Sequence, residues 1–285
     1  MTRFLLVVCT TALLTIVSVL ASPAHAVDCC AFNGGTCTAL PNITHGSSAW
    51  PGAVCPTTIS GTNCTVTLDA DATASSGDCL TIGSGVTVNM AGHSISCTSA
   101  ECGFAIKNTN SGSASAAVRI KDGDLLGCWD VGVQQNAGTN TQVNDVLVDL
   151  AGLSGACTGS GGYTGIYGIK GPMEHIVVKN ARYLGIGLVD DLKSAMVKDS
   201  GNDGPFGDGW GVWISANNVD LDNVLLLGNK RQARNDYVVG LQRSEFQNPT
   251  LCNCVNNNDA CIACDSLFNI TNSTTPTFID DAMIP

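Results

Sequence analysis

Short segments with apolar residues at the first and third positions and a polar residue at the fourth recur through the middle of the chain. This alternation is typical of β-strands that bury one face. Six such segments follow one another at intervals of 19 to 32 residues, and they begin at Val86, Val118, Val146, Ile176, Ala195 and Val219. A second alternating segment precedes four of them, beginning at Gly132, Gly168, Gly185 and Gly211. Two strands repeated at this spacing predict the coils of a solenoid, and a parallel β-helix satisfies the pattern directly.

Other architectures fit the pattern less well. A sandwich of β-hairpins needs tight two-residue turns of the Asn-Gly type, which are scarce here. A βαβ fold needs long amphipathic segments between the strands, and none alternates with them. Three Glu and seven Lys among 285 residues also exclude a helical bundle, whereas 32 Gly and 21 Asp suit many turns. The sequence therefore predicts an all-β parallel β-helix, a solenoid with disulfide-tied terminal caps.

The first residues indicate export. Arg3 precedes the apolar run Phe4–Leu20, and Ala24-His25-Ala26 gives the small-x-small pattern of a signal-peptidase site. We therefore expect residues 1–26 to be a signal peptide. The alternative, a membrane anchor, lacks a positive stop-transfer cluster after the apolar run. The remaining 14 Cys favour an oxidising compartment, so we expect a secreted, periplasmic or cell-surface protein with no membrane span after cleavage.

The cysteines also divide the mature chain. They gather at 27–63 and 249–285, which we interpret as Cys-rich N-terminal and C-terminal caps around a parallel β-helix at 64–248. Cys97, Cys128 and Cys157 each follow a predicted strand by eight or nine residues. They are expected in one column, so a Cys97–Cys128 or a Cys128–Cys157 disulfide is predicted.

The segments 65–68, 79–82 and 85–95, with Ala91-Gly92-His93 at a bend, resemble a known family. They are similar to the opening coils of secreted right-handed parallel β-helix proteins of the pectate-lyase-like superfamily, over about residues 64–245. The resemblance implies a solenoid that binds and cleaves an extracellular polysaccharide, although the superfamily also includes adhesins. The hydrolase motifs Gly-His-Gly and the ordered Asn-Thr-Asp set are absent, as is the Arg-x-Pro-x-x-Arg of calcium-dependent pectate lyases.

Charge narrows the range of partners. The chain carries 13 basic and 24 acidic residues, a net charge of −11, which argues against nucleic acid. Nine of the 13 basic residues lie between Lys170 and Arg243, so an acidic glycan would find positive charge there. We therefore place the candidate site on the coils formed by residues 168–215.

The densest group of acids in this region supplies candidate catalytic and metal-binding residues. Asp190, Asp203 and Asp208 are the predicted catalytic carboxylates, and Asp199, Asp203 and Asp208 the predicted ligands of a Ca²⁺ ion. Closely spaced Asp and Asn oxygens suit this cation. The same residues are also ordinary turn formers, and that interpretation stays open.

Basic and aromatic residues complete the predicted site. Lys170 and Lys193 join the catalytic set, because a uronate lyase must neutralise a carboxylate and remove the adjacent proton. A hydrolase would use two carboxylates instead. Trp210, Trp213 and Arg182 are the predicted substrate-binding residues, with Trp213 on the outer face beside Gln134 and Lys170. We expect a secreted protein that binds an extracellular polysaccharide. Cleavage of an acidic glycan in the manner of a lyase is a further hypothesis, and a non-catalytic surface or adhesive module is the alternative.

Overall fold

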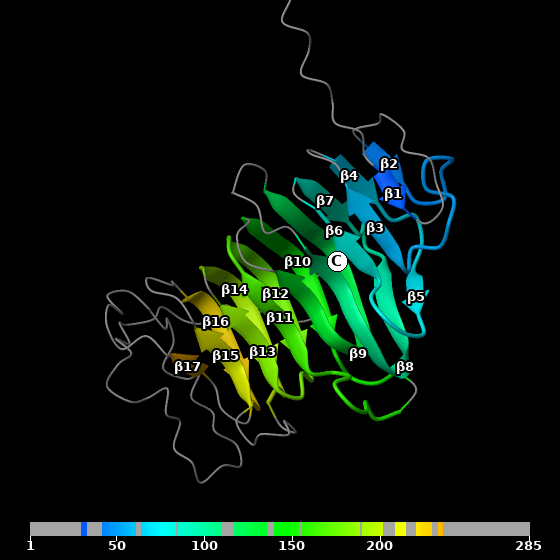
Figure 1. The fold of residues 1–285 in the computed structure, drawn as a ribbon. Helices are drawn as coiled ribbons and strands as arrows, with labels where there is room; N and C mark the ends of the chain where they lie inside the picture. Colours follow the sequence, from blue (N-terminus) through cyan, green and yellow to red (C-terminus); the bar gives the residue numbers. More distant parts are fainter. Residues whose placement is uncertain are drawn as a thin grey trace, which may run out of the picture.

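The computed structural model is a parallel β-solenoid of about six turns, in which the coils stack in chain order from β2 to β17 (Figure 1). It describes residues 30–32, 42–60, 64–83, 85–109, 117–135, 140–153, 155–188, 190–201, 209–214, 221–229 and 233–235. These residues form strands and turns without a helix, and none belongs to a helix that is long and apolar enough to cross a membrane. The all-β solenoid predicted from the alternating pattern is confirmed. The predicted signal peptide and C-terminal cap lie outside the described residues.

The strands vary in length because some of them continue around a corner of the coil. Their bounds are β1 (Cys30–Phe32), β2 (Asn42–Thr44), β3 (Thr57–Ser60), β4 (Cys64–Thr67), β5 (Ala72–Ala74), β6 (Leu80–Ile82), β7 (Val86–Asn89), β8 (Ser94–Asn108), β9 (Val118–Gln135), β10 (Thr141–Asp149), β11 (Thr164–Ile169), β12 (Met173–Lys179), β13 (Leu184–Leu188), β14 (Leu192–Lys198), β15 (Trp210–Ile214), β16 (Leu221–Leu227) and β17 (Ala233–Asn235).

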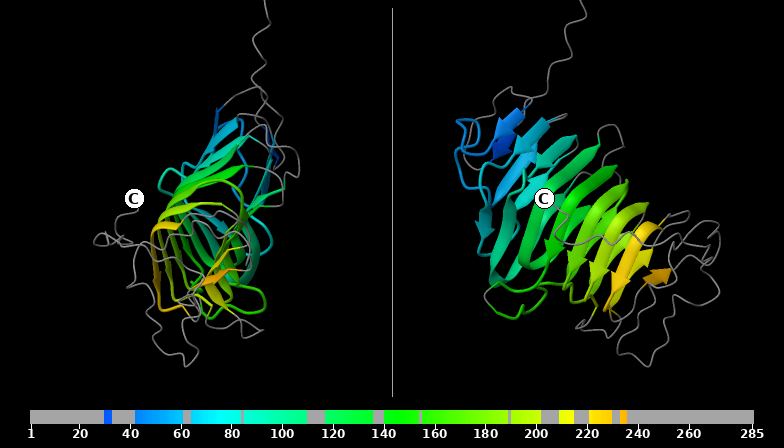
Figure 2. Two further views of the ribbon diagram at one scale, coloured as in Figure 1. Left: turned by 90° about the vertical axis from the view of Figure 1, so that its left-hand side faces the viewer. Right: turned by 180° about the vertical axis from the view of Figure 1, so that it is seen from behind.

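Each full coil contributes to three faces wound around a common axis (Figure 2). The first face contains β2, β4, β7 and the starts of β9, β10, β12, β14 and β16. The second contains β5, the start of β8, the middle of β9 and the ends of β10, β12, β14 and β16. The third contains β3, β6, the ends of β8 and β9, then β11, β13, β15 and β17. Apart from the antiparallel pair β1–β3, these neighbours are parallel.

Residues in the left-handed region form the corners. Between the first and second faces, Asp122, Asp145, His175 and Ser194 stack on successive coils with φ between 49° and 60°. Between the second and third faces, Asn180, Asp199 and Gly228 do the same, with φ between 51° and 59°. Asp122, Asn180 and Asp199 therefore make tight bends, as short polar residues can, and they divide between two corners of the coil.

The register of the repeat also differs from the prediction. The predicted repeat aligns the segment at Val118 with the one at Val146, and the segment at Val219 with the one at Ala195. In the structure, Val118 pairs with Thr141 instead, and Leu221 pairs with Leu192. Both segments are shifted by five residues, from the second face to the first. The apolar pattern permits this shift because the bent strands carry inward residues on both sides of the corner, as Val143 and Val146 do on β10.

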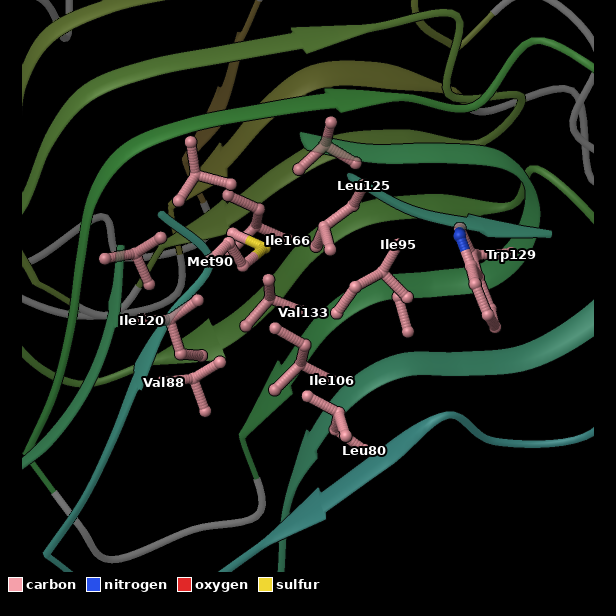
Figure 3. Packing of buried hydrophobic residues seen from close by; sticks show 14 of the residues in the cluster. Leu80, Val88, Met90, Ile95, Ile106, Ile120, Leu125, Trp129, Val133 and Ile166 are labelled. Atoms are coloured by element: carbon pink, nitrogen blue, oxygen red, sulfur yellow. The ribbon is translucent and has the colours of Figure 1, made fainter. Parts of the chain in front are cut away.

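The core is a set of inward columns, one residue per coil, from all three faces (Figure 3). Val88 and Ile120 pair on the first face, Ile95 and Leu125 on the second, and all four side chains are almost completely buried. The third face contributes Leu80, Ile106, Val133 and Ile166 (Figure 3). Because parallel pairing places like positions above one another, each coil needs an apolar residue at every inward position.

A glycine ladder runs up the third face through Gly132, Gly165, Gly185 and Gly211. A Cβ on Gly185 would lie 2.3 Å from Val197 Cγ1 and 2.4 Å from the carbonyl oxygen of Gly211. The equivalent atom on Gly165 would lie 2.4 Å from Val178 Cγ1. The second and third faces therefore approach too closely for a side chain at these four positions. The sequence pattern placed Gly168 in this column, and that prediction is wrong.

Disulfides fasten the coils. Cys128–Cys157 confirms one of the two predicted alternatives, whereas Cys97 is bonded to Cys102 rather than to Cys128. Cys55–Cys79 ties residues of the predicted N-terminal cap to the coil that follows. That segment also contains β2 and β3, so parallel pairing already begins there.

The glycine ladder predicts a sharp difference between two positions of β13. We expect Gly185→Ala to lower the free energy of unfolding by about 1–3 kcal/mol, the usual effect of overpacking a core. Gly187→Ala, on the outer side of the same strand, is the matched control and is expected to change it by less. Urea unfolding measures both, and equal stabilities of Gly185→Ala and the wild type would contradict the packing argument.

Candidate functional site

Aromatic residues occupy the outer side of the third face. Tyr167 on β11, Gly187 on β13 and Trp213 on β15 are in register on three successive coils, and Gln134 on β9 precedes them. Trp213 was predicted in this column with Gln134, and the pairing confirms it. Lys170 was predicted there too, but Tyr167 takes its place, because Gly165 rather than Gly168 aligns with the glycine ladder.

The ring of Tyr167 lies across the neighbouring coil. A Cβ on Gly187 would be 2.7 Å from Cδ2 and 3.2 Å from Cε2 of this ring, and 3.3 Å from Cδ2 of Leu184. Tyr167 therefore covers Gly187, with Leu184 beside it, and 43% of its surface remains exposed. A ring held against the backbone with much of its surface in solvent is a platform on which a ligand can stack.

A second aromatic pair stands at the start of the same strands. Tyr163 and Tyr183 directly precede β11 and β13, and their rings stack with centroids 4.6 Å apart and planes 7° apart. Burial raises the pKa of Tyr163, and Tyr183 and Asp130 add to this effect. Asp130 takes the equivalent position one coil earlier, since its neighbour Val131 pairs with Thr164.

Two carboxylates meet Ser160 next to this pair. The Ser160 hydroxyl donates to Glu101 Oε1 at 2.8 Å, and its backbone N–H donates to the same oxygen at 3.2 Å. Burial raises the pKa of Asp130, and the negative charges of Glu101 and Asp78 raise it further, against a hydrogen bond with Ser160 that lowers it. A carboxyl group with a raised pKa near a second carboxyl group is one feature of acid–base chemistry on a glycosidic bond.

Arg182 secures the loop that carries Ser160. Its Nη1 donates to the carbonyl oxygens of Gly161 at 3.0 Å, Gly159 at 3.2 Å and Cys157 at 3.5 Å. The guanidinium thus holds the backbone of 157–161 near Glu101. Its predicted role in substrate binding stays a prediction, and the contacts add a structural role.

The remaining predicted residues fall into two groups. Exposed Lys170 and half-buried Asp190 lie on successive coils at the corner that leads from the third face to the first. Lys193 is exposed further along, on the first face between Glu174 and Asp222. Trp213 lies near the end of β15, on the coil that follows Asp190.

Asp199 and Trp210 lie at the opposite end of the third face, where Arg182 also stands. The five residues of β13 separate the two groups by about 17 Å. Trp210 is only 5% exposed, so its ring packs against the protein and offers little surface for stacking. Asp203 and Asp208 lie outside the described residues.

Calcium binding stays a prediction. Two of the three predicted ligands, Asp203 and Asp208, are not described, and the third, Asp199, lies 3.9 Å from Lys198 Nζ. Within the described part of the chain, no group of three or more His, Cys, Asp or Glu side chains could hold a metal ion.

Sequence reasoning missed Tyr163, Tyr183, Tyr167 and the Asp130–Glu101 pair. One signal was available: Tyr163-Thr-Gly-Ile166 and Tyr183-Leu-Gly-Ile186 repeat the same four-residue pattern. Aligning these two segments would have placed Gly165 in the ladder and Tyr167 on the outer face. Glu101 is 59 residues from Ser160, and no sequence pattern joins them.

Comparison of the chain with family models, with curated proteins and with solved structures found no match. The fold and the site therefore define the protein as a disulfide-bonded parallel β-solenoid with an aromatic outer face. Its disulfides fit an oxidising compartment.

The raised pKa of Asp130 predicts a pH-dependent stability. A carboxyl with a higher pKa in the folded than in the unfolded protein favours folding while it is protonated, and this advantage is lost as the pH rises through the folded pKa. We therefore expect the wild type to lose stability relative to Asp130→Asn as the pH rises from the ordinary Asp value of about 3.9. Melting temperatures of both proteins across the acid-to-neutral range measure this.

The variant Glu101→Gln tests whether the negative charge of Glu101 contributes to the raised pKa of Asp130. Removing this negative charge is expected to weaken the pH dependence, because Glu101 contributes to the raised pKa of Asp130. A difference in melting temperature between the wild type and Asp130→Asn that stays constant with pH would refute the assignment.

Proposed function

We propose that this protein is a secreted, right-handed parallel β-helix of the pectate-lyase-like type that binds an extracellular polysaccharide through the outer side of its third face. The observation that carries the proposal is the Tyr167 ring, which lies over Gly187 in register with Trp213 and is 43% exposed. Secretion, through the signal peptide at 1–26, is part of the same proposal, and the disulfides support it.

Stacking on aromatic rings suits sugars for a physical reason. One side of a pyranose ring presents C–H groups, which pack against the negative face of an aromatic ring, while its hydroxyl groups point outward to polar partners. Gln134 in the same column and exposed Lys170 at the adjacent corner can supply such partners. The Tyr163–Tyr183 pair extends the aromatic surface along the strands.

Cleavage of the bound glycan is the second candidate function. The carboxylates of Asp130 and Glu101 around Ser160 favour hydrolysis by general acid–base chemistry. A lyase acting on an acidic glycan is the other possibility; it would use Lys170 and Asp190, with Ca²⁺ as cofactor held by Asp199, Asp203 and Asp208. A non-catalytic surface or adhesive module would retain the aromatic face alone.

Binding is tested by truncating the exposed ring. We expect Tyr167→Ala to weaken binding to a polysaccharide that the wild type retains by about tenfold, or ~1.4 kcal/mol, because the stacking surface is lost. Tyr167→Phe keeps the ring and is expected to bind nearly as the wild type does. Leu153→Ala, another exposed apolar side chain, serves as the control. Affinity electrophoresis on a panel of neutral and uronate polymers makes the measurement, and full binding by Tyr167→Ala would refute the site.

Cleavage is tested on the polymers that bind. Asp130→Asn is expected to keep the affinity and to abolish the release of reducing ends, since an amide cannot donate the proton. Unsaturated ends that form only with Ca²⁺ and that survive in Asp130→Asn would favour the lyase instead. If the wild type forms neither reducing ends nor unsaturated ends, the result favours a non-catalytic binding module.

A further inference from the structure

The outer side of the second face carries an apolar column that the proposed function does not use. It consists of four residues that pair on successive coils: Leu147 on β10, Val177 on β12, Met196 on β14 and Leu225 on β16. Along each strand, the residues on either side of these four belong to the core cluster, whereas the four themselves do not. Because side chains alternate along a strand, the apolar column faces away from the core.

The middle of the apolar column is covered. Val177 has 0% of its surface exposed and Met196 only 5%, although Leu147 and Leu225 at the two ends are partly exposed. Neighbours in the same sheet lie beside these side chains and do not cover their outward tips. The exposed fractions are those of a single chain, so the cover comes from another part of the same chain.

The described loops next to the second face are held elsewhere. At the corner toward the first face, β10, β12 and β14 turn through single residues within the strand and form no loop. At the corner toward the third face, the loop 151–163 reaches back to an earlier coil, where the N–H of Thr158 donates to the carbonyl oxygen of Ala100 at 2.9 Å. Gly201 likewise donates to the carbonyl oxygen of Ala181 at 2.7 Å, beyond this corner. Within the described part of the chain, we therefore find no cover for the apolar column.

We infer that segment 265–285 of this chain docks on the apolar column and covers Val177 and Met196. The inference goes beyond the proposed function and does not depend on it. The segment follows the last cysteine, Cys264, and is rich in large apolar residues, namely Leu267, Phe268, Ile270, Phe278, Ile279, Met283 and Ile284. It carries three Asp and no Lys or Arg, so it brings no positive charge beside Lys179 and Lys198, which border the column.

The chain has the length that this docking requires. Residues 236–264 separate the segment from Asn235, the end of β17. An extended chain advances about 3.3 Å per residue, whereas the whole apolar column is only about 14 Å long, three steps of about 4.8 Å. The column therefore lies within reach of the segment.

The internal stretch 202–208 is a weaker candidate for the cover. A Cβ on Gly201 would lie 2.5 Å from the carbonyl carbon of Gly209, so this stretch leaves and returns at one point of the corner. Seven residues that must return extend only about 10 Å outward. Phe206 is their one large apolar residue, which is little to cover side chains on two coils.

Met196 itself reports on its cover, because hydrogen peroxide oxidises an exposed thioether to the sulfoxide. A protease recognition site inserted between Cys264 and Asp265 allows the segment to be cut from the folded, full-length protein and removed by gel filtration in dilute urea. After return to buffer, we expect the rate of Met196 oxidation, measured by peptide mass spectrometry, to rise at least tenfold. Met90 and Met173 have 0% exposure and belong to the core, so they are the internal controls and should keep their slow rates.

Adding the segment back completes the experiment. A synthetic peptide of residues 265–285 is expected to restore the protection of Met196 in a saturable manner, whereas a scrambled peptide of the same composition should not.

Four results would overturn the inference, and none of them bears on glycan binding at Tyr167. The first is an unchanged Met196 rate after removal of the segment. The second is a rise that Met90 and Met173 share, which would show general opening of the solenoid. The third is loss of protection in full-length Phe206→Ala alone, which would assign the cover to 202–208. The fourth is protection of the uncut protein that fades on dilution, which would assign it to a second copy of the chain.

Discussion

Parallel, in-register pairing between coils is the constraint on which the rest of this structure depends. A backbone hydrogen bond from one coil to the next fixes a residue directly above its counterpart, as Val146, Ile176 and Ala195 show on the second face. Every strand position thereby becomes a column of residues, spaced about 4.8 Å from one coil to the next. A column has one environment, so whatever suits one coil, whether core, corner or surface, is imposed on its neighbours.

This constraint explains the unusual composition. The corners need left-handed φ on every coil, and short polar residues tolerate it, which accounts for Asp122, Asp145 and Asn180. The close approach of the second and third faces needs glycine on every coil, because the space beside Val178 and Val197 admits no Cβ. Many of the Gly and Asp residues therefore serve the architecture, and they say little about chemistry.

The same constraint determines what could be predicted from sequence. Alternation identified the strands and the solenoid, since a strand with one buried face needs only a local pattern. Register was harder, because Val143 and Val146 lie on either side of a corner and both face inward, so a shift of five residues keeps the apolar pattern. The site depended on register: an offset of three residues, from Gly165 to Gly168, exchanged Tyr167 for Lys170 on the outer face.

Charge gives a reason to look for binding on the aromatic face rather than among the lysines. On the second face, Lys179 lies 3.6 Å from Asp149, and Lys121 lies 2.7 Å from Asp122 at the first corner. Pairs of this kind between partly exposed side chains contribute modest energy, and they offset the positive charge that a polyanion would need. Lys193 takes a register position on the first face between those of Glu174 and Asp222. Among the described residues, Lys170, Lys179, Lys193 and Lys198 thus lie on separate faces and corners although they are close in the sequence, whereas stacking on Tyr167 does not depend on charge.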